Sequence, residues 1–127
     1  MSKSVFVSFA GTDRHWLGTI RSWNNQGLLG PGLYISGERD DYRQGGETAI
    51  RDELKSLIKG ASVVLFLVGD NSHNPNWVNY EVSLANSYHK RIIVACIPDT
   101  YGGPPPALAN EQIIPLDPSS LRMYLQR

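Results

Sequence analysis

Two apolar runs in the second half of the chain contain no polar side chain. Val63–Val68 and Ile92–Ile97 are apolar at every position rather than at alternate ones. A strand buried on both faces has this composition, and such strands are typical of a parallel sheet covered by helices on both sides. Val5–Phe9 is rich in β-branched and aromatic residues and predicts another strand. Two shorter segments, Leu33–Ile35 and Gln112–Leu116, predict further strands, the last at an edge of the sheet.

Between these strands, apolar residues recur at the spacing of a helix that packs on a sheet. Thr12 or Asp13 is a suitable N-cap for the first helix, and Gly27 suits its C-terminal end. Asp117 or Ser119 is a suitable N-cap for the last helix. The apolar stripes are Trp16, Ile20 and Trp23; Ile50, Leu54, Leu57, Ile58 and Ala61; Val78, Val82 and Ala85, in a helix predicted to run to about His89; and Leu121, Tyr124 and Leu125.

The alternation of strands and helices predicts an α/β fold. We expect a mostly parallel, five-stranded sheet with helices on both faces. The 127 residues are enough for one domain, which we assign to residues 1–127. Ligands of such sheets bind at the carboxyl ends of the strands, so the loops at that edge are the candidates for function. These loops are Ala10–Asp13, Ser36–Gly46, Gly69–Trp77 and Pro98–Leu108.

Composition and charge exclude several classes of protein. Twelve basic and twelve acidic residues give a formal net charge of zero, which argues against nucleic acid as a partner because that binding depends on clustered Lys and Arg. The longest apolar run is far shorter than the roughly 20 residues that cross a bilayer, and no signal peptide is readable. One cysteine, Cys96, cannot form an internal disulfide. We therefore expect a cytoplasmic protein that contacts no membrane.

The common catalytic and phosphate-binding motifs are missing from the sequence. There is neither a G-x-x-x-x-G-K-[ST] loop nor a G-x-G-x-x-G turn after the first strand. The G-x-S-x-G motif of serine hydrolases is also missing. The histidines, His15, His73 and His89, are scattered and show no zinc-like spacing with Cys96. We therefore expect no bound metal.

Trp77 and Glu81 are the best chemical lead. They are one helical turn apart, so they share one face of a predicted helix that begins at the carboxyl edge of the sheet. An aromatic ring beside a carboxylate suits a nucleotide, because the ring stacks on a base and the carboxylate binds ribose hydroxyls or stabilises positive charge at an anomeric carbon. A second interpretation stays open: the helix dipole favours a glutamate early in a helix, and a tryptophan there can simply pack.

Several segments, in the same order, resemble the motifs of TIR (Toll/interleukin-1 receptor) domains, most closely the TIR-like proteins of bacterial Thoeris anti-phage defence. The most specific is Trp77-Val78-x-Tyr80-Glu81, which resembles the W-V-x-x-E helix of that family. The loop after the second predicted strand stands where the family has its BB loop. It departs from the family pattern R-D-x-x-P-G, because it has Gln44-Gly45-Gly46 instead. The other matching segments are Val5–Phe9 with Asp13 at the opening strand, Gly37–Asp40 and Arg43–Gly46 at the BB loop, Ala61–Gly69 at the central strand, and Lys90–Val94 at the next strand.

The resemblance implies a flavodoxin-like three-layer sandwich and an enzyme that cleaves the bond between nicotinamide and ribose in NAD. Members of the family release ADP-ribose or make cyclic ADP-ribose isomers and related signalling nucleotides, so NAD would be the substrate and no separate cofactor is expected. Glu81 matches the catalytic glutamate, and Trp77 matches the aromatic that stacks on nicotinamide. The residues matched to substrate binding are Ser8, Phe9 and Asp13 at the nucleotide cleft, and Arg39 and Arg43 in the BB loop, for phosphates.

The resemblance also implies partners. A separate effector protein would read the nucleotide signal in anti-phage immunity, and TIR domains commonly associate with one another. The main alternative is therefore a non-catalytic module that assembles with other TIR domains. Two other classes share the predicted architecture: a phosphorelay receiver with Asp70 as phosphoacceptor, and an FMN-binding flavodoxin with residues 8–12 around the phosphate. The receiver has less support because no acidic pair follows the first strand.

Overall fold

The computed structural model describes residues 3–10, 13–37, 46–70 and 75–127 of the chain. Strands and helices alternate along it, as the hydrophobic pattern predicts. The elements are β1 (Lys3–Ser8), α1 (His15–Asn25), β2 (Leu33–Gly37), α2 (Gly46–Gly60), β3 (Val63–Val68), α3 (Pro75–Ser87), β4 (Arg91–Cys96), the 3-10 helix η3 (Pro106–Leu108), β5 (Ile113–Pro115) and α4 (Pro118–Leu125).

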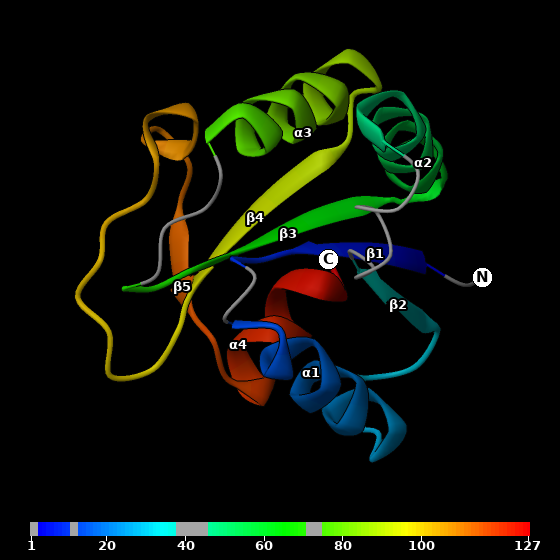
Figure 1. Ribbon diagram of the computed structural model, residues 1–127. Helices are drawn as coiled ribbons and strands as arrows, with labels where there is room; N and C mark the ends of the chain where they lie inside the picture. Colours follow the sequence, from blue (N-terminus) through cyan, green and yellow to red (C-terminus); the bar gives the residue numbers. More distant parts are fainter. Residues whose placement is uncertain (1–2, 11–12, 38–45, 71–74) are drawn as a thin grey trace.

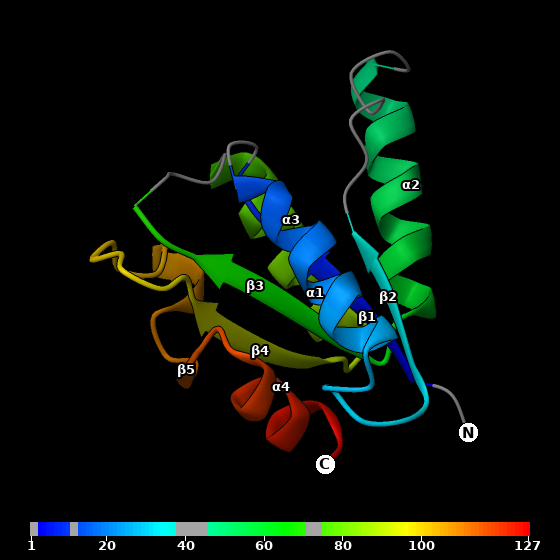
Figure 2. The same cartoon turned by 90° about the horizontal axis from the view of Figure 1, so that it is seen from below.

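The strands form one five-stranded sheet in the order β2-β1-β3-β4-β5, and all neighbouring pairs in it are parallel. Figures 1 and 2 show α1 and α4 on one face of this sheet and α2 and α3 on the other. The predicted α/β fold, with helices on both faces, is confirmed. The order of the strands reverses between β1 and β3, because β2 lies on one side of β1 and β3 on the other. Ligands of parallel sheets bind at the carboxyl ends of the strands at such a reversal.

The strand β1 divides its side chains between the two faces of the sheet. Val5 and Val7 belong to the apolar core under α1 and α4, whereas Phe6 belongs to the core under α2 and α3. Successive side chains of a strand point to opposite faces, so Ser8 shares the side of Phe6 and faces α3. All residues of β3 are buried, as its uninterrupted apolar sequence predicts for a central strand.

Two predicted helix boundaries are wrong by one or two residues. The N-cap of α1 is Arg14 rather than Asp13, and its side chain makes no capping hydrogen bond. The helix α3 ends at Ser87 rather than near His89, because His89 adopts a left-handed conformation with φ 56°. The backbone N–H of Lys90 then donates to the carbonyl of Ala85, which closes the helix as a Schellman motif.

Two predicted caps are confirmed. Gly27 follows α1 with φ 80°, the left-handed conformation that glycine adopts without a steric penalty. Its N–H donates to the carbonyl of Asn24, and the N–H of Leu28 donates to Trp23. At the start of α4, the side chain of Asp117 accepts a hydrogen bond from the backbone N–H of Ser120 at 2.7 Å. The last helix is therefore capped by the first of its two predicted candidates.

Candidate active site

Ser8 and Glu81 meet inside the protein, at the carboxyl end of β1. The hydroxyl of Ser8 donates a hydrogen bond to Oε1 of Glu81, with 3.0 Å between the two oxygens. Ser8 is 0% exposed and Glu81 is 1% exposed. Ser8 is the last residue of β1, whereas Glu81 reaches it from α3. The contact lies where the strand order reverses, the expected place for a ligand in this type of sheet.

The packing of α3 explains why Glu81 is buried. Val78 and Ala85 belong to the apolar core between α3 and the sheet, and Glu81 lies three residues after the first and four before the second. These spacings put all three side chains on one face of the helix. A carboxylate on a buried face loses its hydration, which costs several kcal/mol unless polar groups replace the water. Ser8 is one such group, and an apolar residue would pack at this position without needing it.

Asp13 and Phe9 occupy the segment that leads from β1 to α1. Asp13 is buried, and its backbone N–H donates to the carbonyl of Ala10 at 2.8 Å. Phe9 is also buried, and it packs in the core under α1 and α4, which is the face of the sheet opposite Glu81. Asp13 therefore places a second buried carboxyl group at this edge. The roles of both residues in substrate binding remain predictions.

The remaining predicted site residues fall partly outside the described structure. Trp77 belongs to α3, one turn before Glu81, and the position of its side chain lies outside the described part. Arg39 and Arg43 belong to residues 38–45, which also lie outside it. The contacts of these three side chains with a nucleotide remain predictions from the sequence.

Asp70 has a role that its sequence neighbours do not predict. Its Oδ1 accepts hydrogen bonds from the backbone N–H groups of Tyr101 and Gly102, both at 2.8 Å. Asp70 follows β3, and the two donors follow β4, so one carboxylate joins the loops of neighbouring strands. The residue considered as a phosphoacceptor is thus engaged in holding the backbone. The sequence signal was an aspartate two residues after one central strand and adjacent glycines after the next.

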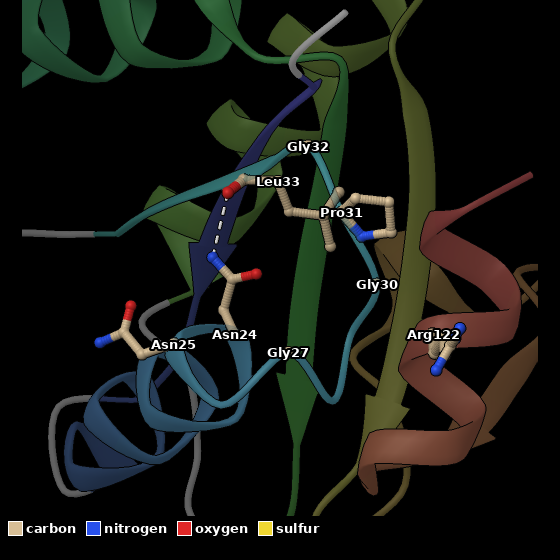
Figure 3. A pocket seen from close by; sticks show the side chains of 8 residues that line it. All are labelled: Asn24, Asn25, Gly27, Gly30, Pro31, Gly32, Leu33 and Arg122. Atoms are coloured by element: carbon tan, nitrogen blue, oxygen red, sulfur yellow. Dashed lines mark hydrogen bonds between the residues drawn. The ribbon is translucent and has the colours of Figure 1, made fainter.

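A separate cavity of about 490 Å³ lies at the opposite edge of the sheet. Figure 3 shows it between the end of α1, the turn that leads into β2, and Arg122 of α4. The amide nitrogen of Asn24 donates to the carbonyl of Leu33 at 3.0 Å in this region. The cavity is lined by Asn24, Asn25, Gly27, Gly30, Pro31, Gly32, Leu33 and Arg122. None of these residues belongs to the predicted site.

Two classes of feature are not found in the described residues. No group of three or more His, Cys, Asp or Glu side chains there is arranged to hold a metal ion. Among the same residues, no helix is long and apolar enough to cross a membrane.

The fold is that of flavodoxin-like α/β proteins. The solved structure of a 2-desoxiribosyltransferase from Leishmania mexicana is similar, with a TM-score of 0.64 over 98% of this chain and 98% of its own, at 10% sequence identity. A likeness at this identity establishes the shared fold alone. No curated protein matches the sequence.

Within this class of folds, the sequence identifies a specific family. Residues 6–101 match the family described as Thoeris protein ThsB, TIR-like domain. The chain belongs to that family. The match includes Ser8, Asp70, Glu81 and Tyr101 and ends before η3. The resemblance to TIR-like Thoeris proteins, predicted from the short motifs, is confirmed.

Proposed function

We propose that this protein cleaves the bond between nicotinamide and ribose in NAD, with Glu81 as the catalytic carboxylate. The observation that carries the proposal is the hydrogen bond from Ser8 to Oε1 of Glu81 at the reversal of the strand order. Membership of the ThsB TIR-like family supports it, since the resemblance to catalytic TIR domains includes both residues. A module that served only for assembly would have no need of a buried carboxylate at this position.

The proposed reaction needs little acid–base chemistry. Nicotinamide in NAD is a positively charged leaving group, so the electron pair of the broken C–N bond neutralises it as it departs. The ribose carbon then carries positive charge shared with its ring oxygen, and the carboxylate of Glu81 stabilises that charge. Ser8 fixes one carboxylate oxygen, which orients the group before the substrate arrives.

The fate of the ribosyl cation decides the product. Attack by water, with release of a proton, gives ADP-ribose. Attack by a nitrogen of the adenine in the same molecule, also with loss of a proton, gives a cyclic ADP-ribose isomer. We propose that a product of this kind acts as the signal in Thoeris defence and is read by a separate effector protein. Trp77 would stack on the nicotinamide, and Arg39 and Arg43 would bind phosphates.

The burial of Glu81 sets a condition on catalysis. Because this side chain is 1% exposed, NAD reaches it only if binding displaces neighbouring side chains. Enzymes commonly exclude water from the reacting atoms by such a movement, and a low dielectric strengthens the electrostatic contribution of a carboxylate. Self-association of the domain would favour the open arrangement if the second copy completed the site.

The test is to incubate the concentrated protein with NAD and to separate the products by chromatography. We expect the wild-type protein to release nicotinamide and an ADP-ribose product, and Glu81→Gln to lower the rate at least 100-fold, in the range found when one stabilising group is removed. Glutamine keeps the size of the side chain and an oxygen for the Ser8 hydroxyl, so the fold should survive, as a thermal melt will check. Glu111→Gln is the matched control and should keep full activity.

Two outcomes would count against the proposal. Nicotinamide release at the wild-type rate by Glu81→Gln would remove Glu81 from the mechanism. No release of nicotinamide by the folded wild-type protein, together with concentration-dependent self-association, would favour the non-catalytic assembly module.

A further inference from the structure

The turn after β4 carries the most exposed large hydrophobic side chain in the described residues. Tyr101 is 95% exposed. A single exposed aromatic residue is common on protein surfaces and needs no special explanation. What distinguishes Tyr101 is that the backbone on both sides of it is held in place by contacts with other parts of the chain.

Asp70 provides the strongest of these contacts. Its carboxylate accepts hydrogen bonds from the N–H of Tyr101 itself and from the N–H of Gly102. A Cβ atom added to Gly102 would overlap the carbonyl oxygen of Gly69 and would lie 2.8 Å from the carbonyl carbon. No other residue fits there without moving the backbone, so the turn after β4 lies directly against the end of β3.

The residues before Tyr101 restrain the turn further. Asp99 has a φ of 61°, a left-handed conformation that Asp adopts more readily than most non-glycine residues and that turns the chain sharply after Pro98. The hydroxyl of Thr100 donates to the carbonyl of Ile97 at 2.7 Å. The backbone is thus fixed on both sides of a side chain that itself makes almost no contact with the protein. Such an arrangement presents the ring of Tyr101 in a defined place.

The turn lies at the same edge of the sheet as Ser8 and Glu81. Figures 1 and 2 show the segment between β4 and η3 extending past the end of β3, on the side where α3 begins. The two residues after Tyr101 are glycines, and a Cβ on Gly103 would meet nothing within 4 Å. The tyrosine ring is therefore a single flat surface with little around it. A protein partner is usually bound by a cluster of anchors rather than by one ring, whereas a planar base needs only a ring on which to stack.

We propose that Tyr101 is the stacking platform for the adenine of NAD. This inference rests on the proposed function, because NAD has two ring systems and only the nicotinamide reacts at Glu81. The adenine is joined to it by two riboses and a pyrophosphate, and it binds on the rim of the same edge. Asp70 is a positioning residue for this contact: it touches no substrate, but it holds the backbone of Tyr101.

Binding of AMP tests the inference without any cleavage step. AMP contains the adenine, ribose and phosphate but has no nicotinamide, so calorimetric titration of the full chain measures the contact directly. We expect Tyr101→Ala to weaken AMP binding about tenfold, the effect of losing one base–aromatic stack. Tyr101→Phe keeps the ring and should bind like the wild type. Tyr34→Ala is the matched control, because Tyr34 is 65% exposed but lies in β2, at the edge strand of the sheet.

The role of Asp70 has its own test. Asp70→Ala removes Oδ1, which accepts both hydrogen bonds, and leaves the tyrosine ring in the chain, so we expect AMP binding to weaken several-fold. Asp70→Asn keeps one side-chain oxygen and should restore most of the affinity. A variant that merely destabilised the protein would lower the melting temperature without this difference between alanine and asparagine.

The outcomes separate the inference from the proposed function. Equal AMP affinity in wild type and Tyr101→Ala would overturn the inference, even if NAD is cleaved with dependence on Glu81. No measurable AMP binding by the wild type, or weakened binding in Tyr101→Phe, would overturn it too, the latter because the hydroxyl and not the ring would be responsible. AMP binding that depends on Tyr101, in a protein that does not cleave NAD, would support the adenine platform and contradict the proposed function.

Discussion

The two edges of the sheet differ in how they use polar groups and glycines. At the carboxyl edge, the Ser8–Glu81 pair is buried, and Gly102 is needed because the backbone of Gly69 approaches it closely. At the amino edge, a cavity is lined by polar side chains and by turn residues such as Gly27. That glycine is needed for its left-handed φ of 80° and not for space, since a Cβ there would meet nothing within 4 Å.

The proposed function places the chemistry at the carboxyl edge and not at the cavity of the amino edge. The cavity at the amino edge is open and lies beside turns that any helix-to-strand connection needs. The carboxyl edge has instead a carboxylate that loses its hydration and a loop held by a second carboxylate. Burying the carboxylate of Glu81 costs free energy that an apolar residue at this position would not cost, whereas Asp70 is exposed and holds the backbone of the turn after β4. Chemistry is therefore expected at the carboxyl edge.

After Glu81→Gln, the largest effect should come from Ser8→Ala. The substitution removes the hydrogen bond that orients Glu81, so we expect NAD turnover to fall about 10- to 100-fold, because a misdirected carboxylate stabilises the ribosyl cation less well. Initial rates of nicotinamide release measure this. Turnover unchanged within twofold would break the link between the buried pair and catalysis.

Ser36→Ala is the matched control for that prediction. The hydroxyl of Ser36 donates to the carbonyl of Val5 at 3.3 Å, on the β2 side of β1 rather than toward α3. We expect its turnover to equal that of the wild type. A loss similar to that in Ser8→Ala would mean that any weakening of β1 disturbs the site.

The next largest effect concerns the close contact between the turn after β4 and the end of β3, and it is measured as the free energy of unfolding. Gly102→Ala introduces a methyl group that overlaps the Gly69 carbonyl, so the free energy of unfolding should fall by about 1–3 kcal/mol, the cost of forcing an extra carbon into a packed place. Gly103→Ala is the control, since the same methyl group meets nothing within 4 Å. Urea denaturation followed by circular dichroism compares the two. Equal stabilities would contradict the close approach of the two loops.

At the amino edge, backbone conformation should decide stability. His89→Gly removes a non-glycine residue from a left-handed conformation, so we expect the free energy of unfolding to rise by about 0.5–1 kcal/mol. Gly27→Ala makes the reverse change at the end of α1 and should lower it by a similar amount. Thermal melts of the two variants beside the wild type measure both. Shifts of the same sign would contradict the explanation.

The smallest effect is expected from the cavity at the amino edge. Arg122→Ala and Asn25→Ala change two of its lining residues, and we expect NAD turnover and AMP affinity to stay within twofold of the wild type. The assays are those used for Ser8 and Tyr101. A clear change in either quantity would show that the two edges are coupled, and the contrast between them would no longer hold.

The sequence predicts the sheet well, and physical reasons explain where it succeeds. Val63–Val68 is predicted as a central strand with its observed bounds, because a strand buried on both faces needs an apolar residue at every position. The ends of the helices are harder. Asp13 resembles an N-cap but is buried beside the end of β1 instead. The left-handed conformation that ends α3 is adopted by His89, and without a glycine at this position the sequence does not indicate it.

The site was predictable in part. Glu81 stands out because it interrupts an otherwise apolar helix face, and the motif around it points to a known family. Its contact with Ser8 depends on the pairing of β1 with β3 and on the packing of α3, neither of which is encoded locally. The contact between Asp70 and the turn after β4 is likewise a tertiary feature, so the position of Tyr101 could not be derived from its neighbours in sequence.

The hydrogen bond between Ser8 and Glu81 also bears on when the proposed active site forms. It joins residues that are 73 positions apart in the chain, and it requires α3 to pack on the sheet in which β1 and β3 are paired. Contacts between such distant segments form late, because the intervening chain must first be ordered. A nascent or partly unfolded chain therefore has Glu81 but no oriented carboxylate. Under the proposed function, NAD cleavage therefore requires the completed fold, and a partly folded chain would not consume this metabolite.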